Sequence, residues 1–64
     1  MDMTDALMIK TWRVTGATWR RIAEYAAETW PDRGYESGNQ IEGRELCQEA
    51  ARVLGEDHRD NCWE

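Results

Sequence analysis

The sequence predicts an all-α protein: a single domain spanning residues 1–64, with three helices in a helix-turn-helix-like order and a short C-terminal tail that packs back. Apolar residues recur at intervals of three and four positions, the helical period, over three stretches. A helix-ending residue follows each stretch, namely Gly16, Pro31 and Gly55. A chain of 64 residues is too short for more than one core. The helices are expected at about residues 5–14, 18–29 and 39–54, with the tail at 55–64.

The first predicted helix, about residues 5–14, is apolar on two sides. Thr4 followed by Asp5 is typical of a helix start, because an acid in the first turn interacts favourably with the helix dipole. Two apolar groups lie on nearly opposite sides of this helix: Met8, Ile9 and Trp12 on one, and Met3, Leu7 and Val14 on the other. Residues 7–15 also contain many strand-forming residues, but no second strand is available to pair with them. We therefore expect a helix, and a homodimer or a partner protein on whichever side stays uncovered.

The central predicted helix, about residues 18–29, has the clearest pattern. Thr18 is a good N-cap, and Pro31 prevents the helix from continuing. One continuous apolar face is formed by Trp19, Ile22, Ala23, Ala26, Ala27 and Trp30. The three alanines predict a shallow groove that another helix can approach closely.

The third predicted helix, about residues 39–54, begins with a capping arrangement in which Asn39 precedes Glu42 by three positions. Gly43 lies on its apolar face although glycine costs about 1 kcal/mol relative to alanine inside a helix. This position predicts close backbone contact with the alanine groove of the central helix. In the polar tail, Trp63 is expected to fold back and cover one end of the core, and Tyr35 is the apolar anchor of the preceding loop.

Charge and composition disfavour several classes of function. The net charge of −5 disfavours nonspecific binding to nucleic acid and to anionic membranes. The N-terminal region is acidic and carries only a four-residue apolar run, so neither a signal peptide nor a membrane span is expected. A cytoplasmic location follows as the expectation, and it places the two cysteines in a reducing compartment.

Two sequence patterns resemble known proteins. Residues 5–29, with a Thr-Gly-Ala turn followed by W-R-R-I-A, resemble the first two helices of a resolvase-type helix-turn-helix module. T-W-R-R-I-A, then G-N-Q-I-E-G-R-E-L-C-Q-E-A-A-R-V-L-G-E-D and a Trp near the end, resemble small uncharacterised helical proteins of phage and bacterial genomes. The second resemblance spans residues 18–63. It implies a self-contained helical unit, encoded by a phage or mobile element, and brings no established activity.

The charged residues are unevenly distributed. Five basic residues oppose three acidic ones between positions 10 and 33, whereas three oppose eight from position 34 onward. Such asymmetry is typical either of solvated helix faces or of two contact surfaces. The candidate contact residues are Lys10, Arg13, Arg20 and Arg21 in the basic region and Glu42, Glu45 and Glu49 in the acidic one.

These surfaces predict a small non-enzymatic interaction or regulatory module that binds a partner protein. The alternative is a DNA-binding helix-turn-helix regulator that uses the four basic residues, which the net charge disfavours.

Metal binding and catalysis find little support in the sequence. Cys47, His58 and Cys62 are three residue types that bind zinc, but their spacing fits no known finger and no fourth soft ligand exists. Cys47 is interpreted as a small core residue, and a reducing compartment disfavours a Cys47–Cys62 disulfide. The single histidine has no evident nucleophile or orienting group. We therefore expect no metal, no cofactor and no enzymatic activity.

Overall fold

The computed structural model describes residues 1–56 and Trp63. It contains helix α1 (Met3–Val14), helix α2 (Trp19–Thr29), a short 3-10 helix η1 (Pro31–Arg33) and helix α3 (Gln40–Val53). No strand is present among these residues. The three-helix all-α prediction is confirmed, and residues 7–14 are helical rather than extended.

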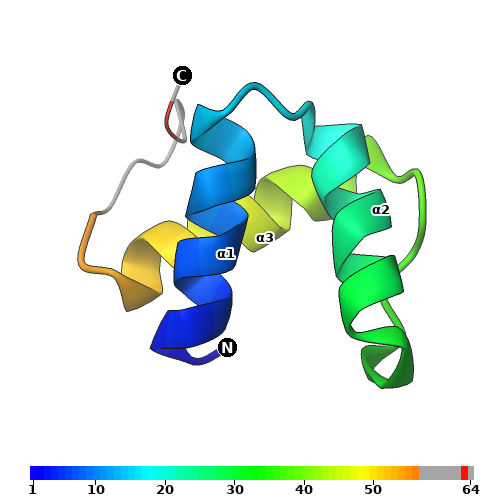
Figure 1. Cartoon of the computed structure of the whole chain (residues 1–64), viewed down its shortest axis with the longest axis horizontal. Helices are drawn as coiled ribbons and strands as arrows, with labels where there is room; N and C mark the ends of the chain where they lie inside the picture. Colours follow the sequence, from blue (N-terminus) through cyan, green and yellow to red (C-terminus); the bar gives the residue numbers. More distant parts are fainter. Residues whose placement is uncertain (57–62, 64) are drawn as a thin grey trace.

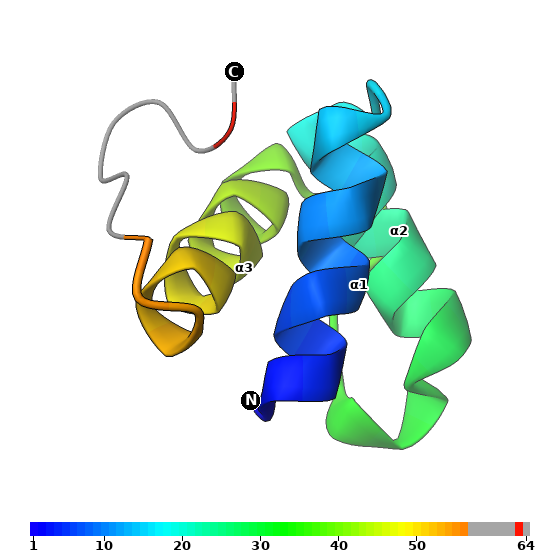
Figure 2. The same cartoon turned by 60° about the vertical axis from the view of Figure 1, so that its left-hand side comes forward.

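Helix α3 is the element that holds the domain together. Figure 1 shows α1 and α2 side by side, joined by the turn at residues 15–18, with α3 crossing behind both. The turned view in Figure 2 shows α3 on one side of the α1–α2 pair. Helix α3 packs extensively against both other helices, whereas α1 and α2 contact each other much less. The predicted pairing of the second and third helices is present, and α3 packs on α1 as well.

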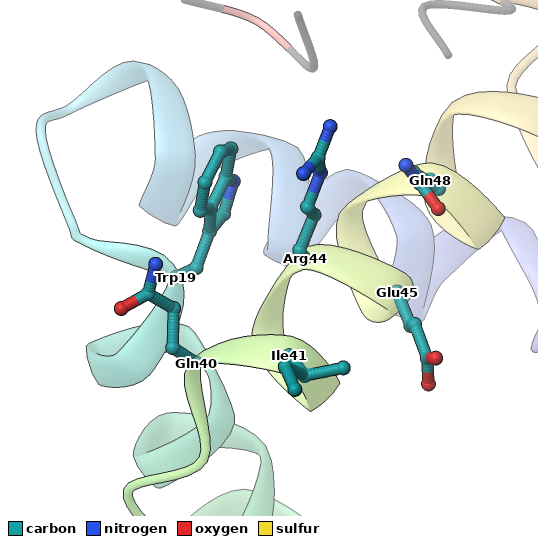
Figure 3. Close-up of a pocket in the computed structure, with 6 residues that line it drawn as sticks. All are labelled: Trp19, Gln40, Ile41, Arg44, Glu45 and Gln48. Atoms are coloured by element: carbon teal, nitrogen blue, oxygen red, sulfur yellow. The ribbon is translucent and has the colours of Figure 1, made fainter. Parts of the chain in front are cut away.

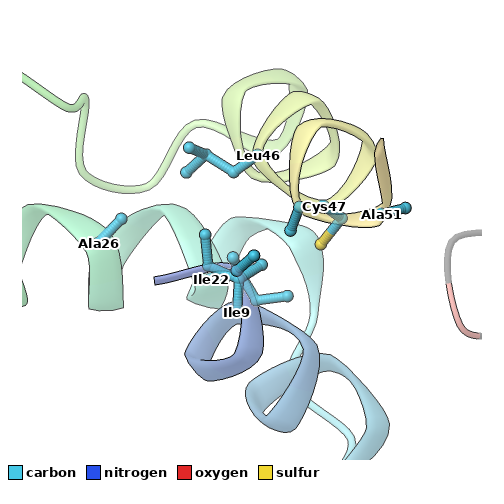
Figure 4. Close-up of a cluster of buried hydrophobic side chains, with 8 residues drawn as sticks. Ile9, Ile22, Ala26, Leu46, Cys47 and Ala51 are labelled. Carbon is cyan, nitrogen blue, oxygen red and sulfur yellow. The ribbon is translucent and has the colours of Figure 1, made fainter. Parts of the chain in front are cut away.

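The core where the helices meet consists of small and medium-sized side chains. Its buried members are Ala6, Ile9, Ile22, Ala26, Leu46, Cys47, Ala50 and Ala51 (Figure 4). The large rings lie around this cluster and are only partly buried, and these are Trp12, Trp19, Trp30, Tyr35 and Trp63. Small residues at the crossing let the helix backbones approach closely. This close approach leaves no room for the large rings between the helices, so the rings cover the periphery of the core.

The start of α1 differs from the prediction. Asp2 is the N-cap, and its carboxylate accepts a hydrogen bond from the backbone N–H of Asp5 at 2.8 Å. The helix therefore begins two residues before the expected position. Asp5 is buried, and its Oδ2 lies 2.5 Å from a guanidinium nitrogen of Arg33, which links α1 to η1. The carboxylate of Asp5 raises the pKa of Arg33.

The predicted boundaries of α2 are confirmed. The Thr18 hydroxyl accepts a hydrogen bond from the backbone N–H of Arg21 at 3.1 Å. The helix ends at Thr29, Trp30 is its C-cap, and Pro31 opens the 3-10 turn of η1.

The predicted N-cap of α3, Asn39, is confirmed, but the Glu42 side chain of the capping arrangement has a different partner. The Asn39 side chain accepts a hydrogen bond from the Glu42 N–H at 3.2 Å. The Glu42 carboxylate accepts from the backbone N–H of Glu36 at 2.7 Å rather than from Asn39. The Asn39 amide in turn donates to the Glu36 carboxylate at 2.9 Å, so the loop is bound to the first turn of α3.

Two further expectations concern packing. Gly43 is buried and lies against the backbone of Trp19, in the first turn of α2, rather than in the alanine groove farther along that helix. The predicted return of the tail is confirmed at Trp63, which packs against the core cluster. The Trp63 ring lies below the Lys10 ammonium, 5.9 Å from the ring centroid.

Candidate functional site

A groove runs between the start of α2 and the exposed side of α3. It encloses about 310 Å³, and its walls are formed by Trp19, Gln40, Ile41, Arg44, Glu45 and Gln48 (Figure 3). Trp19 comes from α2, and every other lining residue comes from α3. Ile41 is 71% exposed, the highest value among the exposed large hydrophobic residues of the described chain. The groove therefore has both a solvent-exposed aliphatic side chain and an aromatic ring in its wall.

Two arginines lie over the Trp19 ring. The guanidinium carbon of Arg13 lies 4.8 Å from the ring centroid and that of Arg44 lies 5.0 Å away. Figure 3 shows the Trp19 and Arg44 side chains standing beside each other. The indole Nε1 is buried and has no hydrogen-bond acceptor among the described residues. Stacking with the two cations, rather than a hydrogen bond, therefore positions this ring.

Most of the predicted basic contact residues are engaged within the chain. Both carboxylate oxygens of Glu56 lie 2.7 Å from the Lys10 ammonium. The Arg13 guanidinium donates a hydrogen bond to the backbone oxygen of Ala17 at 2.9 Å. These side chains bind Glu56, just after α3, and the turn after α1, in addition to any role at a surface.

Arg21 and Arg20, neighbours on α2, have different surroundings. The Arg21 guanidinium pairs with Glu24 at 2.8 Å and lies 4.4 Å from the centroid of Tyr25, and the hydrogen bond with Glu24 raises the pKa of Arg21. Arg20 is exposed, and its side chain lies next to Gly38 in the loop before α3. Arg20 is thus the predicted cation that faces solvent near the start of α3.

The three predicted acidic residues of α3 also have different surroundings. Glu42 binds the loop through Glu36, and Glu49 lies 3.3 Å from the amino group of Met1. Glu45 is exposed and lines the groove beside Ile41. Of the seven candidate contact residues, only Glu45 lies in the wall of this groove. The sequence did not indicate Arg44, Gln40 and Gln48 as residues of the groove wall. Polar residues at this helical spacing occur on any solvent-exposed helix face.

A second exposed region lies on α1. Met3, Leu7 and Val14 are 59%, 51% and 56% exposed, whereas Ile9 is fully buried. Met8 is partly exposed and lines a shallow groove of about 320 Å³ with Thr4, Leu7, Thr11 and Trp12. The side of α1 that the chain leaves uncovered is therefore the one with Met3, Leu7 and Val14.

A third groove, of about 520 Å³, lies at the turn between α1 and α2. Its lining residues are Trp12, Thr15, Gly16, Ala17, Thr18, Arg21 and Tyr25. Trp12 lines both this groove and the groove on α1.

The metal and disulfide expectations fall partly outside the described residues. Cys47 is fully buried in the core, whereas His58 and Cys62 lie outside the part that the structure describes. Within residues 1–56 and Trp63, no three His, Cys, Asp or Glu side chains are grouped so that they could hold a metal ion.

Comparison of the chain with protein-family models, curated proteins and solved structures finds no match. None of the helices in the described part of the chain has both the length and the apolar character needed to cross a membrane.

Proposed function

We propose that this chain is a small non-enzymatic interaction module that regulates or assists a partner protein. The observation that carries this proposal is that the exposed Ile41 side chain and the Trp19 ring line the same groove. Tryptophan and arginine are the residues that most often dominate binding energy in protein interfaces. The groove offers both, together with an aliphatic side chain that binding would remove from water.

Preorganisation supports the same proposal. Arg13 and Arg44 already lie over the Trp19 ring, so a partner that contacts the ring does not have to immobilise it. Immobilising a flexible interface side chain costs about 0.5–1.5 kcal/mol, and a preformed wall avoids that cost.

The groove also specifies the chemistry of the partner surface. Arg44 and Glu45 are adjacent and of opposite sign, and Gln40 and Gln48 add uncharged donors and acceptors. The matching surface is an apolar side chain that contacts Ile41 and Trp19, with an acidic group near Arg44 and a basic group near Glu45. The setting proposed is the cytoplasm of a cell that carries a phage or mobile element.

The test is photocrosslinking in the cell. A photoreactive side chain at position 41 should form a crosslinked adduct with one protein, because Ile41 lies at the centre of the proposed interface. The matched control places the same group at Arg52, which is exposed on the same helix but does not line the groove. An adduct pattern identical at the two positions would contradict the proposal.

A DNA-binding regulator is the second candidate, and one observation favours it. Gln40, Arg44 and Gln48 lie at intervals of four on one side of α3 and line the same groove. Glutamine and arginine are the side chains that read adenine and guanine edges in the major groove. Arg20 is an exposed cation near the start of that helix.

Electrostatics favours the protein partner over DNA. The net charge is −5, and Glu45 lies among the groove residues, where phosphates would repel it. Binding to mixed-sequence duplex DNA at about 50 mM salt separates the candidates, because phosphate contacts are strong there. If the wild type binds the duplex and Arg44→Gln weakens the binding, the DNA reader is favoured. If the wild type does not bind, the DNA reader is excluded.

A further inference from the structure

The groove between the start of α2 and the exposed side of α3 contains charged side chains that the fold itself does not use. Arg44 and Glu45 both line it, and neither forms an ion pair with any residue that the structure describes. The other two glutamates examined on α3 are engaged, because Glu42 binds the preceding loop and Glu49 pairs with the N-terminal amino group. The groove wall therefore presents one unpaired cation and one unpaired anion.

The Arg44 guanidinium is positioned without being neutralised. Its central carbon lies 5.0 Å from the centroid of the Trp19 ring, and Figure 3 shows the two side chains beside each other. A cation–π contact depends on the charge of the guanidinium and leaves its N–H donors available to an acceptor. Those donors form a planar fork that matches the two oxygens of a carboxylate. Arg44 is therefore prepared to bind a carboxylate group.

The remaining wall limits what else the occupant of the groove can carry. Ile41 precedes Arg44 by three positions and Glu45 by four, so both charges lie one turn from the exposed aliphatic side chain. In Figure 3 the Glu45 side chain points away from Arg44. An acidic group bound to Arg44 therefore does not have to approach Glu45, whereas a second acid on the Glu45 side would be repelled.

We propose that the occupant of this groove is an acidic peptide segment of the partner protein. An Asp or Glu side chain of the segment binds the Arg44 guanidinium, and a neighbouring apolar side chain covers Ile41 and Trp19. This inference rests on the proposed function, because it specifies the segment that the interaction module binds. Apolar contact supplies binding energy, and Arg44 determines which segments bind.

Charge favours a peptide carboxylate over the phosphates of a nucleic acid. A single carboxylate neutralises the one unpaired cation of the wall and adds no further charge beside it. A nucleic acid would bring a row of phosphates to a chain of net charge −5 and toward Glu45 in the same wall.

Selection from a random peptide library on the purified full chain tests the inference. Peptides that bind the wild type should be enriched in Asp and Glu close to apolar residues. Selection on Arg44→Gln should lose the acidic residues and keep the apolar ones, because Ile41 and Trp19 remain. The matched control is Arg52→Gln, which removes an exposed arginine of the same helix that does not line the groove and should select as the wild type does. Circular dichroism should show equal helicity in all three proteins.

One selected peptide then gives the size of the effect. Changing its acid to the corresponding amide, or Arg44 to Gln, should each weaken binding at least about tenfold. The two changes together should weaken it little more than either alone, because each removes the same charge pair. Raising the salt concentration from about 50 mM to about 500 mM should weaken binding to the wild type more than binding to Arg44→Gln, because salt screens the pair.

Three outcomes overturn the acidic segment: no enrichment of acids on the wild type, enrichment that Arg44→Gln retains, or enrichment that Arg52→Gln loses equally. Ile41→Glu separates this failure from failure of the proposed function. If it abolishes binding of peptides that lack acids, the groove binds a segment through apolar contact, and the interaction module stands without this inference. If no selected peptide is sensitive to Ile41→Glu, the groove is not a peptide site and both proposals fail.

Discussion

A β-carbon on Gly43 would lie 1.6 Å from the carbonyl oxygen of Trp19 and 2.4 Å from its carbonyl carbon. Both atoms belong to the backbone of α2, so neither can rotate away as a flexible side chain would. Gly43 is buried within α3, and it marks the place where α3 crosses the first turn of α2. The crossing of these two helices therefore requires a residue without a side chain.

We predict that Gly43→Ala destabilises the protein by about 3 kcal/mol or more, at or above the top of the usual range for overpacking. Helix propensity alone would make the alanine variant more stable by about 1 kcal/mol. A loss of stability would therefore show that the packing clash outweighs helix propensity. Gly43→Leu should be worse still. Urea unfolding measures the change, and Arg52→Ala on the exposed side of α3 is the control. A Gly43→Ala protein as stable as the wild type would show that the helices cross elsewhere.

The helices were predictable because local signals mark them. Thr18 and Asn39 cap their helices through their own side chains, and Pro31 stops α2, so each boundary is determined within a few residues of sequence. The start of α1 was predicted two residues late. Asp5 has the position of a first-turn acid, but Asp2 forms the cap, and the partner of Asp5 is Arg33, 28 residues away.

The surfaces were less predictable, because they depend on contacts between distant residues. Periodicity showed that α1 has two apolar sides, but only the position of α3 determines that Ile9 is buried and Leu7 exposed. The distribution of basic residues along the sequence does not show which group each long side chain contacts. Arg44 stacks on Trp19 and Lys10 binds Glu56, contacts that join separate elements and have no local pattern.

The cap of α3 can be tested by single substitutions. Asn39→Ala should cost about 1 kcal/mol, because the Glu42 N–H loses its acceptor, whereas Asn39→Gly should cost only a few tenths. Thermal unfolding monitored by circular dichroism measures both changes. Equal stability of the wild type and Asn39→Ala would show that water replaces the cap without loss.

An aromatic series links α1, α2 and the loop that follows η1. The Trp12 centroid lies 5.2 Å from Tyr25 and 5.8 Å from Trp30, and Trp30 lies 6.1 Å from Tyr35 in an edge-on arrangement. Tyr35→Ala removes the last ring and should cost at least about 0.5–1.5 kcal/mol, the range for such pairs beyond their buried area. Tyr35→Phe keeps the ring and is the matched control. Equal losses in the two variants would assign the effect to the hydroxyl instead.

Zinc should not affect folding. Structural zinc contributes folding free energy directly, so a zinc site would make helicity and melting temperature depend on added metal or chelator. Cys47 lies fully buried among apolar side chains, and we expect Cys47→Ala to fold with only a moderate loss of stability. A rise in melting temperature with zinc that Cys62→Ser abolishes would contradict this interpretation of Cys47.

The last prediction concerns how Trp63 is held against the helices. Its ring packs on the core cluster and lies 5.9 Å from the Lys10 ammonium, which also binds both carboxylate oxygens of Glu56. Trp63→Ala should cost about 2 kcal/mol, less than the 3–5 typical of a fully buried tryptophan, because this ring is only partly buried.

Lys10→Met keeps most of the side-chain stem and removes the charge. It should cost less than Trp63→Ala, about 0.2–1 kcal/mol, as expected for an ion pair that solvent reaches. Because Lys10 contacts both Glu56 and Trp63, the Lys10→Met and Trp63→Ala losses should sum to more than the loss in the double variant. Denaturant unfolding of the four proteins measures this coupling. Strictly additive losses would show that Lys10 and Trp63 stabilise the domain independently, and that the ring is held by apolar contacts alone.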